Sequence, residues 1–184
     1  MSTLSFLRAG IKSIRTTGTI TRSSPALCRA AIEAIDFERA RTIIELGAGD
    51  GVITEHILQR LHPDGKVIAF EVDRELCNDM RRIGDPRLIV AEDSAEHQAR
   101  YLAEIGQHQA DYIVSALPYA ALPPELGKRI VAESARLLRP GGVYSQVHYS
   151  LKTKSFYADA FGNVAVRFVP WNLPPAFVLT SHKH

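Results

Sequence analysis

The chain has 184 residues and a formal net charge of +2, and 46% of its residues are hydrophobic. This length and composition are typical of one soluble globular domain, and no run approaches the roughly 18 apolar residues of a membrane-spanning helix. The N-terminus lacks the continuous apolar segment and cleavage site of a secretory signal, so we expect a cytoplasmic protein.

Positive charge is concentrated near the N-terminus, where residues 1–32 contain no acidic side chain. The basic residues of this arm are Arg8, Lys12, Arg15, Arg22 and Arg29. Leu4, Leu7, Ile11 and Ile14 recur among them at helical spacing. A basic amphipathic helix can lie in the headgroup region of an anionic membrane, so we expect Arg8, Lys12 and Arg15 to bind membrane. A solvated helix that caps the domain and a transit-peptide-like segment are the alternatives.

From residue 42 onward, short β-branched runs alternate with helix-like segments. The expected strands lie at 42–46, 66–73, 87–91, 110–116 and 142–150. The expected helices lie at 51–61, 74–83, 95–105 and 124–138. This alternation predicts a doubly wound α/β fold with a parallel sheet and helices on both faces. The last two extended runs, 163–171 and 174–181, are too close for a crossover helix and should form an antiparallel hairpin.

The cysteines and histidines give no metal-binding pattern. Cys28 and Cys77 are far apart, each within a helical pattern, and the seven histidines are scattered. We therefore predict reduced core thiols and no metal site.

The turn after the first strand is rich in glycine and flanked by acidic residues. It reads Glu45-Leu46-Gly47-Ala48-Gly49-Asp50-Gly51 and passes directly into a helix. Glycines allow the backbone to approach a ligand, and Glu71, at the end of the second strand, can accept hydrogen bonds from ribose hydroxyls. Val52 replaces the last glycine of the dinucleotide pattern, and Glu45 and Asp50 would repel a pyrophosphate. The turn therefore favours a nucleoside ligand with a positively charged amino acid end.

Together these motifs resemble the class I methyltransferases that bind S-adenosylmethionine. The segment "VAEDSAE" (90–96) matches the turn after the third strand, where Asp93, beside Ser94, would meet the adenine. The terminal hairpin matches the reversed last strand of these enzymes. The resemblance implies a basic arm and helix over 1–36 and a methyltransferase domain over 37–184 with S-adenosyl-L-methionine as cofactor. The cofactor-binding residues that it implies are Glu45, Gly47, Ala48, Gly49, Gly51, Glu71, Val72, Asp93, Ser94 and Ser115.

The turn after the fourth strand carries information about the methyl acceptor. It reads Ser115-Ala116-Leu117-Pro118-Tyr119. Enzymes that methylate adenine keep an Asn or Asp before such a proline, which accepts hydrogen bonds from the amino group, and an aromatic residue that stacks on the flipped base. Tyr119 keeps the aromatic ring, but Ser115 and Ala116 lack the amide. The turn fits a nucleobase poorly, so we do not expect a nucleic acid partner.

The same turn, with the late segment "NLPPAFV" (172–178), resembles the bacterial phospholipid N-methyltransferases, which convert phosphatidylethanolamine towards phosphatidylcholine. The arm segment 6–32 is similar as well. The sequence departs from that family at Arg22, where proline is common, at Asp50, where threonine is usual, and at Ala116, where glycine is usual. The alanine could mean a different headgroup or an altered degree of methylation.

This resemblance implies a lipid amine as acceptor, at the cytoplasmic surface of the inner membrane. Ser115 and the Ala116 and Leu117 carbonyls would accept hydrogen bonds near the incoming nitrogen, and Tyr119 and Tyr149 would offer aromatic faces to the methylated cation. Trp171 is a third candidate for such a face, although we expect it in the core instead. The catalytic residues so implied are Ser115 and Tyr119, and the substrate-binding residues are Ala116, Leu117, Pro118, Tyr119 and Tyr149.

Two alternatives remain open from the sequence. One is an RNA adenine methyltransferase, which shares the Leu-Pro-Tyr turn and would use the basic arm to bind phosphate. The missing Asn and the lack of a helical RNA-binding region after the hairpin argue against it. The other is a non-catalytic domain that binds S-adenosylmethionine and uses the arm as a tether.

Overall fold

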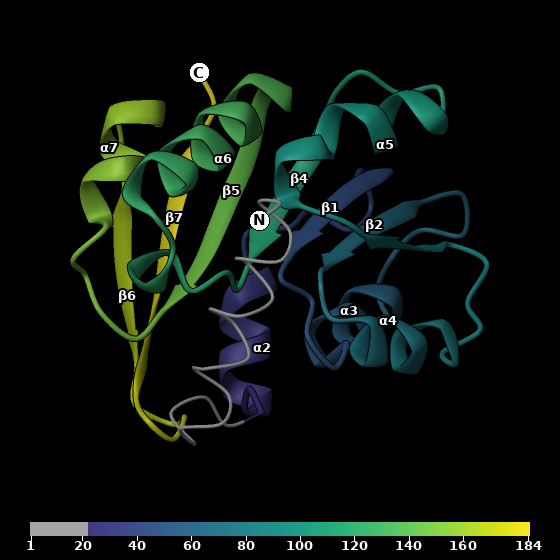
Figure 1. The fold of residues 1–184 in the computed structure, drawn as a ribbon, viewed down its shortest axis with the longest axis horizontal. Coiled ribbons are helices and arrows are strands. Elements are labelled where there is room, and N and C mark those ends of the chain that lie inside the picture. Colours follow the sequence, from purple (N-terminus) through teal and green to yellow (C-terminus); the bar gives the residue numbers. More distant parts are fainter. Residues whose placement is uncertain (1–21) are drawn as a thin grey trace.

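A computed structural model describes residues 22–184, and seven strands form one sheet in the order β3-β2-β1-β4-β5-β7-β6 (Figure 1). The strands are β1 (Thr42–Leu46), β2 (Lys66–Glu71), β3 (Leu88–Glu92), β4 (Ala110–Ser115), β5 (Leu138–His148), β6 (Ala165–Val169) and β7 (Ala176–His182). The predicted membrane contacts Arg8, Lys12 and Arg15 lie outside the described residues.

Helices cover both faces of this sheet. The α-helices are α2 (Pro25–Ile32), α3 (Val52–Leu58), α4 (Arg74–Arg81), α5 (Gln98–Glu104), α6 (Pro124–Leu137) and α7 (Lys154–Phe161), and the short 3-10 helices are η1 (Ala95–His97) and η2 (Tyr119–Ala121). In Figure 1, α2, α3 and α4 lie on one side of the sheet, and α5, α6 and α7 on the other. None of the helices within residues 22–184 is long and apolar enough to cross a membrane.

The pairing of the strands confirms the predicted fold class. Strands β1 to β5 pair in parallel, whereas β7 runs antiparallel to both β5 and β6. In the register of the central strands, Leu46 at the end of β1 lies beside Phe70 of β2 and Ser115 of β4. The carboxyl ends of these three strands therefore meet at one edge, which is where ligands bind in open α/β sheets.

Alternate residues of each central strand enter two separate cores. Ile44 packs on the side of α5, α6 and α7, and its neighbour Ile43 packs on the side of α2 and α3. Leu27 and Cys28 of α2 are fully buried in that second core. This helix therefore packs directly on the sheet, and a domain boundary near residue 36 stays a prediction. Both cysteines are buried free thiols, as expected.

Three details of the sequence prediction need correction. Strand β5 begins at Leu138 rather than residue 142, because Gly141 and Gly142 exchange backbone hydrogen bonds with Lys183 at the end of the hairpin. Helix α7 was not predicted. Trp171 is 81% exposed rather than in the core, because the loop between β6 and β7 buries the side chain of Asn172 instead.

Candidate functional site

The glycine turn after β1 packs tightly against the turn after β4. Gly47 has a φ of +72°, and a Cβ atom there would lie 2.9 Å from the Leu117 Cδ2 atom and 3.2 Å from the Leu117 backbone nitrogen. Gly51, with a φ of +80°, is the N-cap of α3. Both positions need left-handed backbone, and Gly47 also leaves no room for a side chain. At the edge of the sheet the half-buried Gly47 therefore presents backbone without a side chain.

Glu71, at the end of β2, holds this turn in place. Its Oε2 accepts a hydrogen bond from the Gly49 nitrogen at 2.9 Å, and its Oε1 accepts from the Val72 and Asp73 nitrogens at 2.8 and 2.9 Å. The carboxylate is buried, so these charge-assisted bonds fix its position. A small cavity opens beside it. The lining residues are Gly47, Phe70, Glu71, Val72, Asp93, Ala95, Leu117 and Ile130.

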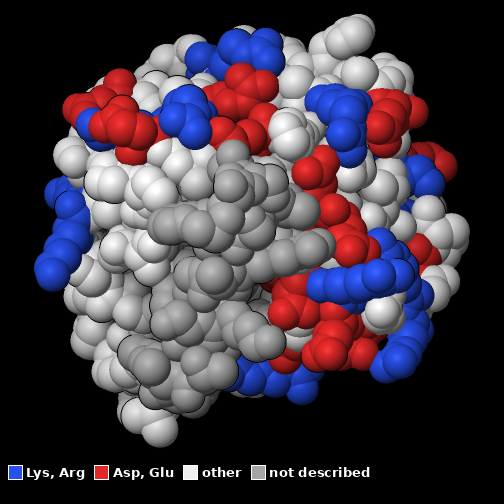
Figure 2. Space-filling model, in the orientation of Figure 1, with Lys and Arg blue, Asp and Glu red and all other residues white. Residues whose placement is uncertain are grey.

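Glu45 adds a second buried carboxyl near the glycine turn. Thr54 donates a hydrogen bond from its hydroxyl to Glu45 Oε2 at 2.6 Å, whereas Oε1 has no partner among the described residues. Burial raises the pKa of Glu45 to about 8. Figure 2 shows further acidic side chains on the visible face, over the region where Figure 1 labels β1 and α3. Glu45 is therefore largely uncharged at neutral pH, and it is the surrounding acidic side chains that suit this region to a ligand with a positive charge.

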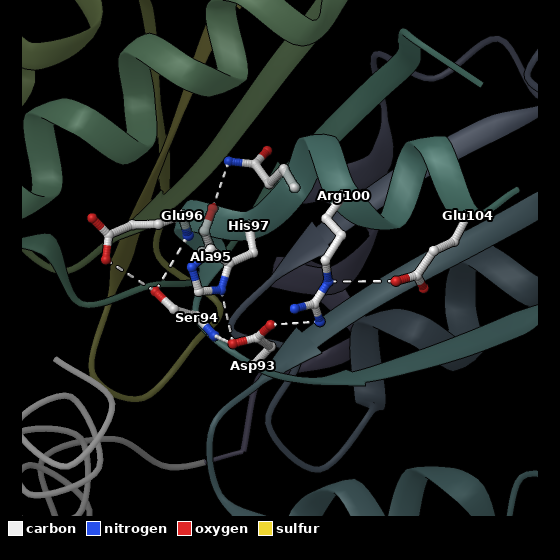
Figure 3. Close-up of polar contacts among 8 residues, drawn as sticks. Asp93, Ser94, Ala95, Glu96, His97, Arg100 and Glu104 are labelled. Carbon is white, nitrogen blue, oxygen red and sulfur yellow. Dashed lines mark hydrogen bonds and ion pairs between the residues drawn. The ribbon is translucent and has the colours of Figure 1, made fainter. Parts of the chain in front are cut away.

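Asp93 lies at the edge of the same cavity, where both of its oxygens have partners (Figure 3). Oδ1 accepts from the Ser94 nitrogen at 2.7 Å and contacts His97 Nδ1 at 2.9 Å, and Oδ2 accepts from Arg100 Nη2 at 2.9 Å. The Ser94 hydroxyl caps η1 through the Glu96 nitrogen at 3.3 Å. These contacts hold the Asp93 carboxylate in a fixed orientation.

The turn after β4 forms the wall between two cavities. The second cavity, of about 250 Å³, has a mostly apolar lining. Its lining residues are Ala116, Leu117, Pro118, Ala120, Ala121, Val147, His148, Tyr149, Ser150 and Pro174. Leu117 lines both cavities. Four of the five predicted substrate-binding residues thus meet at this second cavity, directly beside the cavity at the glycine turn.

Ser115 and Tyr119 lie behind that wall. Ser115 is fully buried, and its hydroxyl accepts a hydrogen bond from the Leu117 nitrogen at 3.3 Å. Tyr119 is buried too, its hydroxyl lies 2.9 Å from that of Tyr144, and it is absent from the cavity lining. Burial raises the pKa of Tyr119 to about 12. The phenol therefore stays protonated at neutral pH and cannot act as a general base. Because neither Ser115 nor Tyr119 lines the two cavities, a direct catalytic role for either residue stays a prediction.

The Leu117 carbonyl does not have the role expected from the sequence. It accepts hydrogen bonds from the Tyr119 nitrogen at 2.9 Å and from Gln146 Nε2 at 3.0 Å. A carbonyl oxygen has two lone pairs, and both are used here. Leu117 therefore contributes its side chain to the cavities, and its carbonyl is not available to the incoming nitrogen.

His148 is a cavity residue that the sequence analysis missed. Its Nε2 lies 2.7 Å from the Tyr157 hydroxyl and 3.2 Å from the Thr153 hydroxyl. Burial lowers the pKa of His148 to about 4, so the imidazole is neutral at neutral pH. The only sequence signal was its place beside Tyr149 at the end of an expected strand.

The buried His148 should make folding stability depend on pH. Because its pKa falls from 6.5 to about 4 on folding, the unfolded chain binds more protons in that range, and stability should fall as pH drops from 6.5 to 4. The full effect is on the order of 3 kcal/mol. Melting temperatures between pH 4 and pH 7.5, compared with those of His148→Gln, would measure it. Glu45 has the opposite effect, because its raised pKa increases stability as pH falls from 8 to 4.5. Both proteins contain Glu45, so the difference between their profiles isolates His148. Identical profiles would contradict the assignment of the stability loss to His148.

Two of the departures from the phospholipid methyltransferase pattern contact each other. Arg22 Nε lies 3.0 Å from Asp50 Oδ2 in an exposed ion pair. Exposed ion pairs contribute little stability, so the effect of this pair is on the position of the chain. The pair connects the segment before α2 to the glycine turn.

The described residues fit S-adenosylmethionine. Gly47 lines a cavity without a side chain, Glu71 presents a buried carboxylate there, and the acidic surroundings match a cationic ligand. A dinucleotide fits less well, because its pyrophosphate would lie at the start of α3, next to the Asp50 carboxylate. Within residues 22–184, no group of three or more His, Cys, Asp or Glu side chains is arranged to hold a metal ion.

Comparison with known proteins decides the family. Residues 43–142 match the family model described as "Methyltransferase domain". The chain belongs to this family. An ornithine lipid N-methyltransferase of Singulisphaera acidiphila is 36% identical over 157 residues, which are 84% of this chain and 82% of the relative. This methyltransferase therefore uses S-adenosylmethionine as its methyl donor.

Other matches are shorter or concern the fold alone. A ribosomal RNA small subunit methyltransferase A of Acidobacterium capsulatum is 43% identical over 58 residues, which are 32% of this chain and 19% of the relative. Among solved structures, the 1,6-didemethyltoxoflavin-N1-methyltransferase of Burkholderia thailandensis, with S-adenosylhomocysteine bound, has a TM-score of 0.69 at 16% identity. That match covers 98% of this chain and 86% of the other.

Proposed function

We propose that this methyltransferase transfers methyl groups to the amine of a lipid headgroup at a membrane surface. The observation that carries the proposal is the 36% identity, over 84% of the chain, to an ornithine lipid N-methyltransferase. Phosphatidylethanolamine is the first substrate to test, because the Ser115–Pro118 and Asn172–Ala176 segments resemble enzymes that methylate it. Ornithine lipid is the second. Both present an amine next to long acyl chains.

The two adjoining cavities support this assignment. The cavity beside Glu71 would hold the cofactor, and the apolar cavity across Leu117 would hold the acceptor. Only a neutral amine has the lone pair needed to attack, and an apolar cavity lowers the pKa of an amine that enters it. Desolvation of the headgroup by the lining residues would therefore help to release its proton to solvent.

When bound, S-adenosylmethionine supplies an electrophilic methyl group on a sulfonium. The chain itself would align the amine and exclude water. The product carries a positive charge on nitrogen, so a cation near the acceptor would oppose the reaction. His148 is neutral, and Tyr149 offers an aromatic face beside it. We propose that these two residues, with Ala116 and Pro118, hold the headgroup.

The arm would bring the enzyme to its substrate. Arg8, Lys12 and Arg15 precede the described residues and would contact anionic lipids of the inner membrane. Deleting residues 2–20 should then lower transfer to vesicles more than transfer to a soluble short-chain lipid.

Transfer of labelled methyl groups tests the function directly. The full chain would receive labelled S-adenosylmethionine with phosphatidylethanolamine vesicles, ornithine lipid vesicles and small-subunit ribosomal RNA in parallel. Label in lipid is the expected result. Label in RNA alone would instead support the RNA adenine methyltransferase, and cofactor binding without transfer to any acceptor would support the non-catalytic domain.

Filling the second cavity should separate acceptor binding from cofactor binding. Ala116 is half-buried and lines only the second cavity. Ala116→Leu should lower methyl transfer to lipid roughly tenfold or more, because the added carbons occupy space that the headgroup needs. Calorimetry should find the cofactor affinity within about twofold of the unmodified protein, since this lining is separate from Glu71. The matched control is Ala132→Leu on the exposed face of α6, and equal activities of the two variants would count against the acceptor cavity.

A further inference from the structure

The loop between β6 and β7 presents large apolar side chains to solvent. Trp171 is 81% exposed, Leu173 is 77% exposed and Phe168 at the end of β6 is 55% exposed. Figure 1 shows this hairpin loop reaching the lower edge of the molecule beside α2, and Figure 2 shows uncharged atoms along that edge. Exposed apolar residues that lie close together mark an interaction surface. We call these three residues the tip surface.

The tip surface is held in shape by a buried side chain. Asn172, between Trp171 and Leu173, is buried, and its Oδ1 accepts from the Ser24 nitrogen at 2.9 Å. Its Nδ2 donates to the Pro174 carbonyl at 2.7 Å, and the Ser24 hydroxyl donates to the Trp171 carbonyl at 2.8 Å. These bonds pin the loop to the start of α2. The two apolar neighbours of Asn172 therefore point outward as a consequence of specific bonds.

Basic side chains surround the tip surface. A shallow groove next to Phe168 and Trp171 is lined by Arg29, Arg60 and Arg167, with Glu33 as its one acidic residue. Arg167 pairs with Glu33, and the Arg60 guanidinium lies 4.3 Å from the centre of the Phe37 ring. The groove keeps an excess of positive charge. Tryptophan beside arginine is the combination that favours the headgroup layer of an anionic membrane.

The tip surface is continuous with the acceptor cavity. Pro174, which follows Leu173, lines the cavity next to Tyr149 and His148. A membrane seated on Trp171 and Leu173 would therefore lie against one wall of the cavity that receives the headgroup. A lipid could then move its amine into the cavity without leaving the bilayer.

We propose that the tip surface, with Arg29, Arg60 and Arg167, is a docking surface for an anionic phospholipid bilayer, distinct from the arm. The proposal rests on the proposed lipid substrate. It assigns the loop between β6 and β7 to membrane binding and gives the exposed aromatic side chains a function. The occupant is a bilayer surface that carries net negative charge.

Trp171 is the only tryptophan of the chain, so its fluorescence reports on this surface alone. On addition of vesicles of phosphatidylglycerol and phosphatidylethanolamine, the emission of the full chain should shift to shorter wavelength and be quenched by brominated lipid. Vesicles of phosphatidylcholine alone should give a much smaller shift. If the protein binds the vesicles but the emission of Trp171 does not change, the proposal is overturned, because the arm would then be the binding site. A blue-shifted emission without vesicles that moves to longer wavelength when residues 2–20 are deleted would also overturn it, because the arm would then cover Trp171.

Variants separate the contributions of the apolar and the charged side chains to vesicle affinity. In vesicle flotation, Trp171→Ala should lower the apparent affinity about tenfold, and Trp171→Phe should keep most of it. Arg29→Ala should lower affinity for anionic vesicles about fivefold, whereas Arg136→Ala, on the exposed face of α6, should not. Equal effects of the two arginine variants would contradict the assignment of Arg29 to the docking surface.

Failure of this inference and failure of the proposed function give different results. Transfer to a soluble short-chain phosphatidylethanolamine, without any fluorescence shift on vesicles, would keep the function and remove the docking surface. A fluorescence shift on vesicles without transfer to any lipid would keep the docking surface and remove the function.

Discussion

Glu71→Ala should lower the affinity for S-adenosylmethionine about 100-fold or more, since hydrogen bonds to a charged group contribute about 1.5–3 kcal/mol each. In the structure this carboxylate also binds the nitrogens of Gly49, Val72 and Asp73. The variant therefore loses a ligand contact and the bonds that position the glycine turn. Isothermal titration calorimetry with the methyl donor measures the change.

The matched control for this change is Glu75→Ala. Glu75 is an exposed acid in the first turn of α4, four residues away. It should bind the methyl donor as the unmodified protein does. Circular dichroism must show that Glu71→Ala is folded, and a folded variant whose affinity stays within about threefold would remove Glu71 from the cofactor site.

Gly47→Ala should remove cofactor binding and lower the melting temperature. The new Cβ would lie 2.9 Å from Leu117 Cδ2 and 3.2 Å from a backbone nitrogen, at a φ of +72°. Left-handed strain and the clash together should cost about 2–3 kcal/mol, which corresponds to roughly 5–10 °C in melting temperature for a chain of this size. Because Gly47 lines the cavity beside Glu71, the relaxation should also close part of the binding surface.

Gly106→Ala separates strain from the clash. Gly106 has nearly the same φ, +71°, but a Cβ atom there would meet no other atom within 4 Å. This control should lose only about 1 kcal/mol and bind the methyl donor normally. If both variants lose equal stability and keep the cofactor, the close approach of the glycine turn to Leu117 has no role in binding.

The positions of the residues predicted to bind the cofactor followed from local patterns. Gly47 and Gly51 stand at a strand-to-helix turn, and Glu71 ends the next strand. In parallel sheets the carboxyl ends of adjacent strands meet at one edge, so the pattern of strands and helices alone placed these residues together. The same reasoning predicted the terminal hairpin, because two extended runs without a helix between them have to turn back.

Contacts between distant segments were beyond that reasoning. The sequence did not indicate that Leu117 separates two cavities, that its carbonyl is already bonded, or that Tyr119 turns towards Tyr144. These facts depend on how the turn after β4 packs against β5. No local pattern contains that information, because each contact joins residues far apart in the chain.

Trp171 shows most clearly what the sequence could not predict. Hydrophobicity alone predicts burial for a tryptophan, yet Asn172 is the buried residue. Its amide oxygen accepts a hydrogen bond from Ser24 at the start of α2, and its amide nitrogen donates to the Pro174 carbonyl of its own loop. The sequence by itself determined the α/β fold, the glycine turn and its acidic partner, since these depend on neighbouring residues and on strand order. Only the tertiary structure decided which side chains line the apolar cavity beside Leu117 and which face solvent, because packing between segments far apart in the chain sets the direction of each side chain.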